Sequence, residues 1–247
     1  MNNEIYNNNE DNDNEVKKND DKCANNIDSD KINSIKELGN IPATMQNERI
    51  QVISIIGQVE GHNVLNAQNK STKYEHIIPQ LIAFEQNEKV EGVLIVLNTV
   101  GGDVEAGLAI AEMINSISKP TVSIVIGGGH SIGVPLATSS DYSFITPSAT
   151  MIVHPIRMNG FIIGTEQTFE YFKKMQERID DFIVRTSDID HKTLHELMIK
   201  NGELLNDVGA ILIGKEAVDY KLINEVGGIS DAIKKLNELI DEKKKKS

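Results

Sequence analysis

The chain of 247 residues is poor in aromatic side chains, in cysteine and in positive charge, and each shortage excludes a class of protein or site. Phe, Tyr and Trp make up 4% of the residues and Trp is absent, so a core must pack from Ile, Leu, Val and Ala. The single cysteine, Cys23, excludes an internal disulfide framework and a cysteine-rich metal site. The formal net charge of -12 argues against binding to nucleic-acid phosphates.

Long apolar runs are also missing from the sequence. No eighteen consecutive apolar residues occur, so we expect no membrane-spanning helix. The first thirty residues are polar and acidic and lack the apolar stretch of a secretory signal. We therefore expect a soluble, cytoplasmic protein. Hydrophobic residues make up 39% of the chain, which is enough to bury a substantial core.

The N-terminal segment differs in composition from the rest of the chain. Residues 1–45 are rich in Asn, Asp, Lys and Glu, and so few apolar side chains cannot offset the entropy cost of ordering the segment. We expect a disordered arm here, with a flexible recruitment tag as the alternative. Residues 46–247 alternate strand-like and helix-like segments joined by glycines, which indicates a single α/β domain.

Two predicted strands end in glycines. The aliphatic run 92–98 is followed by Gly101 and Gly102, and the run 121–126 is followed by three glycines and then Ser131. Because ligands bind at the carboxyl edge of open α/β sheets, we expect both turns to lie at that edge. One turn can then carry a serine nucleophile while the other donates backbone N–H groups to an oxyanion.

A serine hydroxyl is a poor nucleophile until a base accepts its proton. His154, in a short predicted strand downstream of Ser131, is the candidate base. The remaining histidines form no recognisable metal-ligand set, and no dinucleotide fingerprint is complete, so we expect neither a metal nor a cofactor. A buried serine and a structural histidine are the alternative interpretation.

Four segments, in order along the chain, resemble those of the Clp protease proteolytic subunit family. They are the Asn-Thr-Val-Gly-Gly sequence at 98–102, Ser-Ile-Gly at 131–133, Met-Ile-Val-His-Pro at 151–155 and Glu-Ala-Val-Asp-Tyr-Lys-Leu-Ile at 216–223. The segments 127–135 and 168–178 are similar to the translocation-enhancing, TepA-like branch of that family. The resemblance implies the Clp/crotonase fold, which stacks ββα units and has a long protruding helix.

The resemblance also implies an activity and its residues. It implies a cytoplasmic serine peptidase acting on peptides or unfolded proteins, with Ser131 as nucleophile and His154 as general base. Backbone N–H groups of Gly102 and Ile132 would form the oxyanion hole. Asp207 is the candidate third member of the triad, although an ungapped match falls near Leu205 instead.

The resemblance further implies a homo-oligomeric ring. The segment 165–186 has the period of a long amphipathic helix and lies where the family places its contact between rings. Docking of an ATP-driven unfoldase, as in the family, is left open.

The sequence departs from the family pattern around the predicted site. His130 precedes the nucleophile, where a second base or a locally bonded side chain would fit; Val100 replaces a proline; and Pro155 directly follows His154. These departures favour, as one alternative, a catalytically weak pseudo-protease that acts as a scaffold.

Two other enzyme classes are further alternatives. A crotonase-like acyl-CoA enzyme has the same fold and shares the oxyanion hole. An α/β-hydrolase esterase has the Gly-x-Ser-x-Gly turn found at 129–133, but its triad order is Ser, acid, His.

Overall fold

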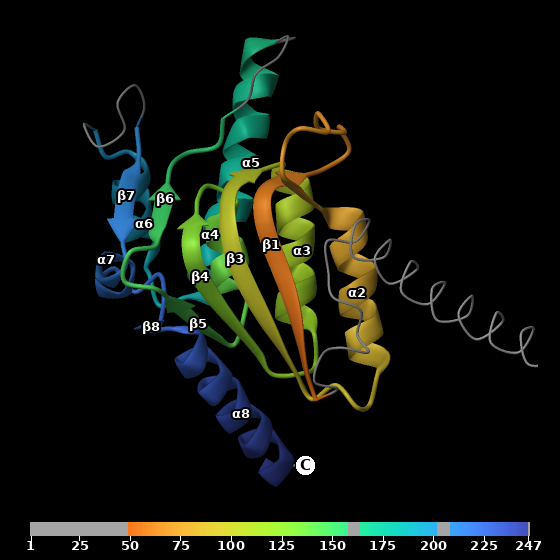
Figure 1. Cartoon of the computed structure of the whole chain (residues 1–247). Helices are drawn as coiled ribbons and strands as arrows, with labels where there is room; N and C mark the ends of the chain where they lie inside the picture. Colours follow the sequence, from red (N-terminus) through yellow and green to blue (C-terminus); the bar gives the residue numbers. More distant parts are fainter. Residues whose placement is uncertain (1–48, 158–163, 202–207, 247) are drawn as a thin grey trace, which may run out of the picture. The chain divides into compact units, whose positions relative to one another are not determined.

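Runs of Ile, Val and Leu, which favour extended backbone, form the strands of an eight-stranded sheet in the computed structural model. The structure describes residues 49–157, 164–201 and 208–246. A parallel path in the order β2–β1–β3–β4–β5–β8 makes up most of the sheet (Figure 1). Its strands are β1 (Ile50–Glu60), β2 (Ser71–Lys73), β3 (Gly92–Gly102), β4 (Thr121–Gly129), β5 (Tyr142–Ile145) and β8 (Glu225–Val226).

Two further strands form a branch that joins the sheet at β4. The strand β6 (Thr150–Val153) joins β4 in parallel through the single pair Gly128 and Thr150. On its other side β6 pairs antiparallel with β7 (Ala210–Ile213), which comes from a distant part of the sequence. The segment that carries His154 is therefore attached to the main sheet by a short contact.

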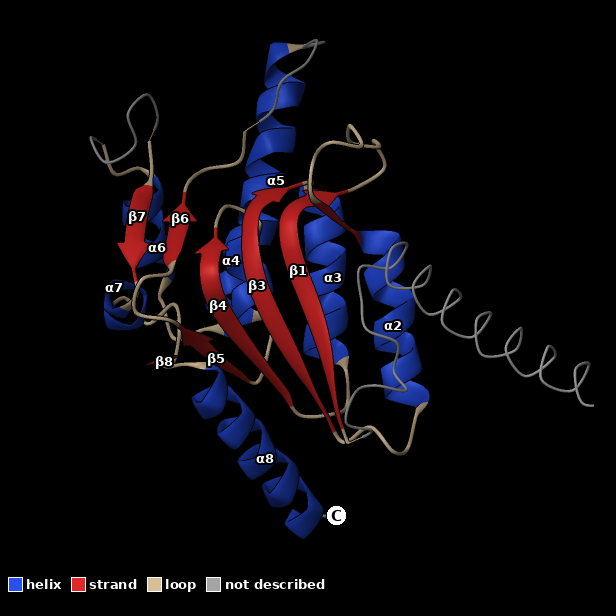
Figure 2. Ribbon diagram, in the orientation of Figure 1, coloured by secondary structure: helices blue, strands red, loops and turns tan. Residues whose placement is uncertain are grey.

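Helices cover both faces of the sheet, which explains why its central strands are almost continuously apolar. On one face, Ile95 and its neighbours pack in a large core with the helices α2 to α6; on the other, Leu94 and Ile124 pack against α8 (Figure 2). The predicted α/β class and Clp-type fold are confirmed. The helices are α2 (Tyr74–Gln86), α3 (Val104–Ser116), α4 (Gly133–Thr138), α5 (Thr165–Thr186), α6 (His191–Met198), α7 (Lys215–Asp219) and α8 (Ile229–Lys246).

The helix α5 packs against the domain with its C-terminal half only. Ile179, Phe182 and Ile183 are buried, whereas Phe169 is 67% exposed and Tyr171 is 51% exposed. Its first turns extend beyond the sheet in Figure 1. The predicted protruding helix is therefore present, and its apolar face divides into a buried inner part and an exposed outer part.

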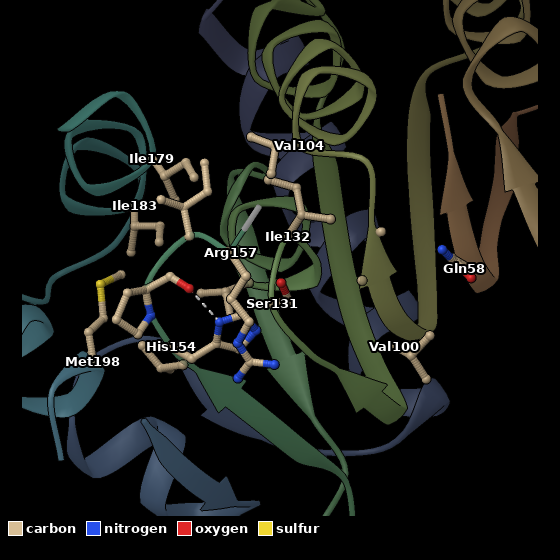
Figure 3. Close-up of a pocket in the computed structure, with 16 residues that line it drawn as sticks. Gln58, Val100, Val104, Ser131, Ile132, His154, Arg157, Ile179, Ile183 and Met198 are labelled. Atoms are coloured by element: carbon tan, nitrogen blue, oxygen red, sulfur yellow. Dashed lines mark hydrogen bonds between the residues drawn. The ribbon is translucent and has the colours of Figure 1, made fainter. Parts of the chain in front are cut away.

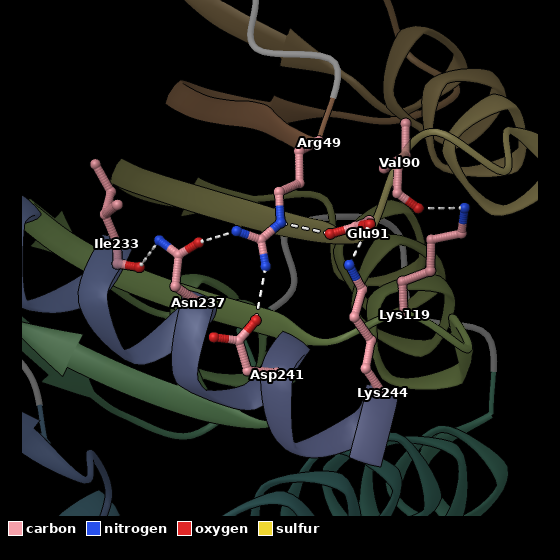
Figure 4. Close-up of polar contacts among 8 residues, drawn as sticks. All are labelled: Arg49, Val90, Glu91, Lys119, Ile233, Asn237, Asp241 and Lys244. Carbon is pink, nitrogen blue, oxygen red and sulfur yellow. Dashed lines mark hydrogen bonds and ion pairs between the residues drawn. The ribbon is translucent and has the colours of Figure 1, made fainter. Parts of the chain in front are cut away.

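A polar network fastens α8 to the beginning of the strands β1 and β3 (Figure 4). Arg49 donates to Asn237 Oδ1 and to Asp241 Oδ1, each at 2.9 Å, and forms an ion pair with Glu91. Lys244 Nζ also pairs with Glu91, at 2.6 Å. Hydrogen bonds from Lys244 and Arg49 hold the pKa of Glu91 below its usual range.

The predicted arm at residues 1–45 lies outside the described residues. Within the part that is described, no helix is long and apolar enough to cross a membrane.

Candidate active site

Ser131 lies between the end of β4 and the start of α4 in a strained backbone conformation. Its φ is 57°, which for a residue other than glycine costs about 1–2 kcal/mol. Hydrogen bonds on both sides offset this strain. The Ser131 N–H donates to the carbonyl oxygen of Ile152, and its own carbonyl accepts from Val134 N–H, each at 2.9 Å. The sharp turn keeps the hydroxyl at the sheet edge rather than in the core.

The two glycines that end β3 lie directly against the Ser131 turn, where the sequence predicts a turn after the strand. A Cβ atom built on Gly101 would lie 2.7 Å from the Cβ of Ser131, and φ at Gly101 is 89°. Glycine is required here both for space and for the backbone conformation. Gly102 has a φ of 150°, and a Cβ there would lie 2.2 Å from the carbonyl oxygen of Val59. The glycine end of β3 and the Ser131 turn therefore meet at one edge of the sheet.

Thr99 and Asn98 hold these turns in place, and sequence reasoning assigned neither residue a function. Thr99 is 1% exposed; its hydroxyl donates to the Gly57 carbonyl at 2.6 Å and accepts from Gly101 N–H at 3.0 Å. Asn98 Oδ1 accepts from Gly128 N–H at 2.9 Å, where the pairing of β3 with β4 changes register. Their position directly before the two glycines was the signal that could have identified them.

The backbone N–H of Ile132 differs from those of its two neighbours in its hydrogen bonding. The N–H groups on either side are used internally, by Ser131 to Ile152 and by Gly133 to the carbonyl of His130 at 2.8 Å. Within the described ranges the Ile132 N–H has no acceptor. Its side chain is only 2% exposed and lies against Gly107, which fixes the direction of the peptide group.

His154 follows β6 and is half-buried. Its Nδ1 lies 2.6 Å from the carbonyl oxygen of Pro155 (Figure 3). A carbonyl oxygen can only accept, so Nδ1 carries the proton and Nε2 holds the lone pair. This is the tautomer that a general base needs.

Ser131 and His154 line the same cavity, which has a volume of about 400 Å³ (Figure 3). Gly101, Gly102 and Ile132 line it as well. Further lining side chains come from β3, α3, α4, β6 and the segment after it, α5 and α6, with Gln58 and Arg157 as additional polar groups. The apolar wall residues are Val100, Val104, Val134, Val153, Pro155, Ile156, Ile179, Ile183 and Met198.

A sequence model of the Clp protease family matches residues 46–230. The chain belongs to the Clp protease family. The translocation-enhancing protein TepA of Halalkalibacterium halodurans is 57% identical to it over 85% of this chain and 82% of that protein. ATP-dependent Clp protease proteolytic subunits are more distant. That of Streptococcus uberis is 30% identical over 76% of this chain and 87% of that protein, and that of Leuconostoc citreum is 27% identical over 64% and 76%.

Of the site residues expected for this family, the structure brings together Gly102, Ser131, Ile132 and His154. Asp207 lies outside the described residues. In the ranges that are described, no group of three or more His, Cys, Asp or Glu side chains could hold a metal ion.

His130, the residue before Ser131, is bonded to a neighbouring strand. Its Nε2 lies 2.8 Å from the hydroxyl of Thr150 in β6. Burial lowers the pKa of His130, and the charge of His154 lowers it further. This contact fits the alternative of a locally bonded side chain and ties the turn that carries Ser131 to the strand that leads to His154.

Proposed function

We propose that this Clp protease family member is a serine-type endopeptidase that hydrolyses peptides or unfolded proteins in the cytoplasm. The main support is the contact of Gly101 with Ser131 in a cavity that also contains His154. Acyl transfer needs a nucleophile, a base and oxyanion donors within reach of one carbonyl group. The apolar walls suit an apolar side chain next to the bond that is cleaved.

In this mechanism His154 Nε2 accepts the proton of Ser131 while Oγ attacks the peptide carbonyl carbon. The carbonyl oxygen becomes an oxyanion, which the N–H groups of Ile132 and Gly102 stabilise. His154 then returns the proton to the leaving amine, and an ester with Ser131 remains. A water molecule, deprotonated by His154, hydrolyses that ester. Asp207 is the acid that the family resemblance offers as third member of the triad; in that role it would replace the Pro155 carbonyl oxygen as the acceptor of the His154 Nδ1 proton.

We also propose that the active form is a homo-oligomeric ring. The outer half of α5 exposes Phe169 and Tyr171, and an exposed apolar helix face of this kind favours association. An ATP-driven unfoldase would be the partner that feeds such a ring. The similarity to TepA favours a role that supports protein export, with quality control as the related alternative.

A fluorophosphonate probe tests the nucleophile directly. We expect the assembled protein to be labelled at Ser131, as located by peptide mass spectrometry, and Ser131→Ala to abolish both labelling and peptide cleavage. Ser116→Ala, at an exposed serine of α3, is the matched control and should leave both unchanged. An assembled wild-type protein that is not labelled would refute the peptidase and favour the scaffold. Enoyl-CoA turnover that survives Ser131→Ala would favour the crotonase-like alternative.

A further inference from the structure

The peptide group between Pro155 and Ile156 is hydrogen-bonded at both ends. Its carbonyl oxygen accepts from His154 Nδ1 at 2.6 Å, and its N–H donates to Gln176 Oε1 at 2.7 Å. An amide that donates through its N–H becomes a stronger acceptor at its carbonyl, because hydrogen bonds in a chain polarise one another. This one peptide therefore connects the candidate base to the helix α5.

Gln176 is itself held by a carboxylate one turn further along α5. Its Nε2 donates to Asp180 Oδ1 at 2.7 Å and also contacts Met198 Sδ at 3.2 Å. The orientation of the amide follows from its partners: a backbone N–H requires an acceptor, and a carboxylate requires a donor. Every donor in the chain from His154 to Asp180 therefore points toward the carboxylate.

We propose that Gln176 and Asp180 are positioning residues, which fix His154 as the Nδ1-protonated tautomer through the Pro155–Ile156 peptide. The inference rests on the proposed peptidase function. In a Ser-His-Asp triad a carboxylate bonds to the imidazole directly and stabilises the imidazolium that forms. Here the carboxylate of Asp180 acts through the two amides.

The surroundings of Asp180 determine when this carboxylate is charged. Burial raises the pKa of Asp180 above its usual range, and the charge of Asp181 acts in the same direction. The bond from Gln176 and the histidines of α6, His191 and His195, act in the opposite direction. Asp180 therefore takes up a proton at a higher pH than an ordinary aspartate. Once it is protonated, its charge no longer polarises the hydrogen bonds that lead to His154.

The test compares the rate of fluorophosphonate labelling across pH in the assembled wild type, in four variants of Gln176 and Asp180, and in one control variant. Gln176→Met keeps the shape but removes both polar bonds, and we expect labelling to slow about ten-fold, the typical effect of losing one hydrogen bond to a charged group. The acid limb of the pH profile of the labelling rate should also move to lower pH, because the protonated form of His154 loses the stabilisation that the relay gives it. Asp180→Asn keeps the bond but removes the charge and should shift the limb in the same direction.

A reversed pair provides a rescue. Gln176→Glu alone keeps the acceptor for Ile156 N–H but places two carboxylates together, and should slow labelling. Adding Asp180→Asn supplies an amide donor to the new carboxylate, so the double variant should recover the wild-type rate to within about two-fold. Gln80→Met on α2, whose side chain bonds to its own helix at His76, is the matched control. A double variant as slow as Gln176→Glu alone would count against the relay.

The tautomer of His154 is measured independently of activity by ¹⁵N NMR of histidine-labelled protein. We expect Nδ1–H in the wild type and a mixture of tautomers in Gln176→Met. An unchanged tautomer and an unchanged acid limb in folded Gln176→Met would overturn the relay. A wild type that is not labelled would refute the peptidase instead, and the NMR comparison would still decide whether the relay acts on His154.

Discussion

The close approach of Gly101 to Ser131 makes Gly101→Ala a sharp test of the active-site geometry. The added Cβ would lie 2.7 Å from the Ser131 Cβ and 2.8 Å from the His130 carbonyl oxygen, whereas ordinary contacts begin at 3.4 Å. Neither atom is the end of a flexible side chain. Ser131 or the glycine turn must therefore move by about 0.7 Å, the difference between 2.7 and 3.4 Å.

A shift of this size should affect reactivity more than folding. A displacement of 1 Å costs roughly 100-fold in rate, or about 2.7 kcal/mol, so we expect Ser131 labelling to slow between ten-fold and 100-fold. The positive φ of Gly101 should lower the free energy of unfolding by about 1–2 kcal/mol. In a chain of this size that corresponds to a fall in Tm of roughly 2–8 °C.

The assay is the rate of fluorophosphonate labelling, measured beside circular dichroism and native mass spectrometry on the same samples. Gly228→Ala is the control, because its Cβ would lie 3.8 Å from the nearest atom, Asp231 Oδ2, and its φ is not in the positive range. The control should label at the wild-type rate. If folded and assembled Gly101→Ala labelled just as fast, the close approach would not be what positions the nucleophile.

Three further predictions concern pH and assembly. Burial lowers the pKa of His130, so its contribution to stability is fully present above about pH 6.5 and is lost as pH falls. His130→Asn should therefore flatten the decline of Tm between pH 7 and 5. A decline as steep as that of the wild type would show that His130 does not cause it. The hydrogen bond from Lys244 lowers the pKa of Glu91, so the contribution of Glu91 to stability is present above about pH 4.5 and is lost in acid. Glu91→Gln should lower the free energy of unfolding by about 1 kcal/mol at pH 7 and by almost nothing at pH 3, as measured by chemical unfolding. Phe169→Asp should reduce the assembled mass in native mass spectrometry without lowering the Tm of the subunit, because Phe169 is 67% exposed; unchanged assembly would exclude this face.

The parts of the fold that the sequence predicted are those that depend on local pattern. The strands β3 and β4 are aliphatic runs buried on both faces, and α5 has an apolar stripe of helical period, so their positions can be inferred without tertiary information. The structure extends both strands through the glycines that were expected to be turns. The short strand β2 was missed, because three residues carry no periodicity.

The candidate site was likewise predictable only where it depends on the order of residues along the strands. Its glycines and Ser131 follow the strands in sequence, so the sheet edge alone brings them together. The contacts of Gln176 with Ile156 could not be inferred, because they depend on how α5 docks beside the segment after β6. A glutamine on an amphipathic helix is in most cases a solvated residue, and only its two partners distinguish it.

The two halves of the site are consequently held by different kinds of interaction. Backbone hydrogen bonds and the glycine contact hold Ser131, so few side-chain substitutions can move it without disrupting the sheet edge. The strand β6 has one residue pair with the main sheet, and in the segment after it the side chain of Gln176 holds the Pro155–Ile156 peptide. Substitutions on α5 should therefore change the protonation of His154 while Ser131 keeps its position. The position of Ser131 follows from the sequence motif, whereas the hydrogen bonds around His154 depend on how α5 docks, so the motif alone does not determine how active the proposed site is.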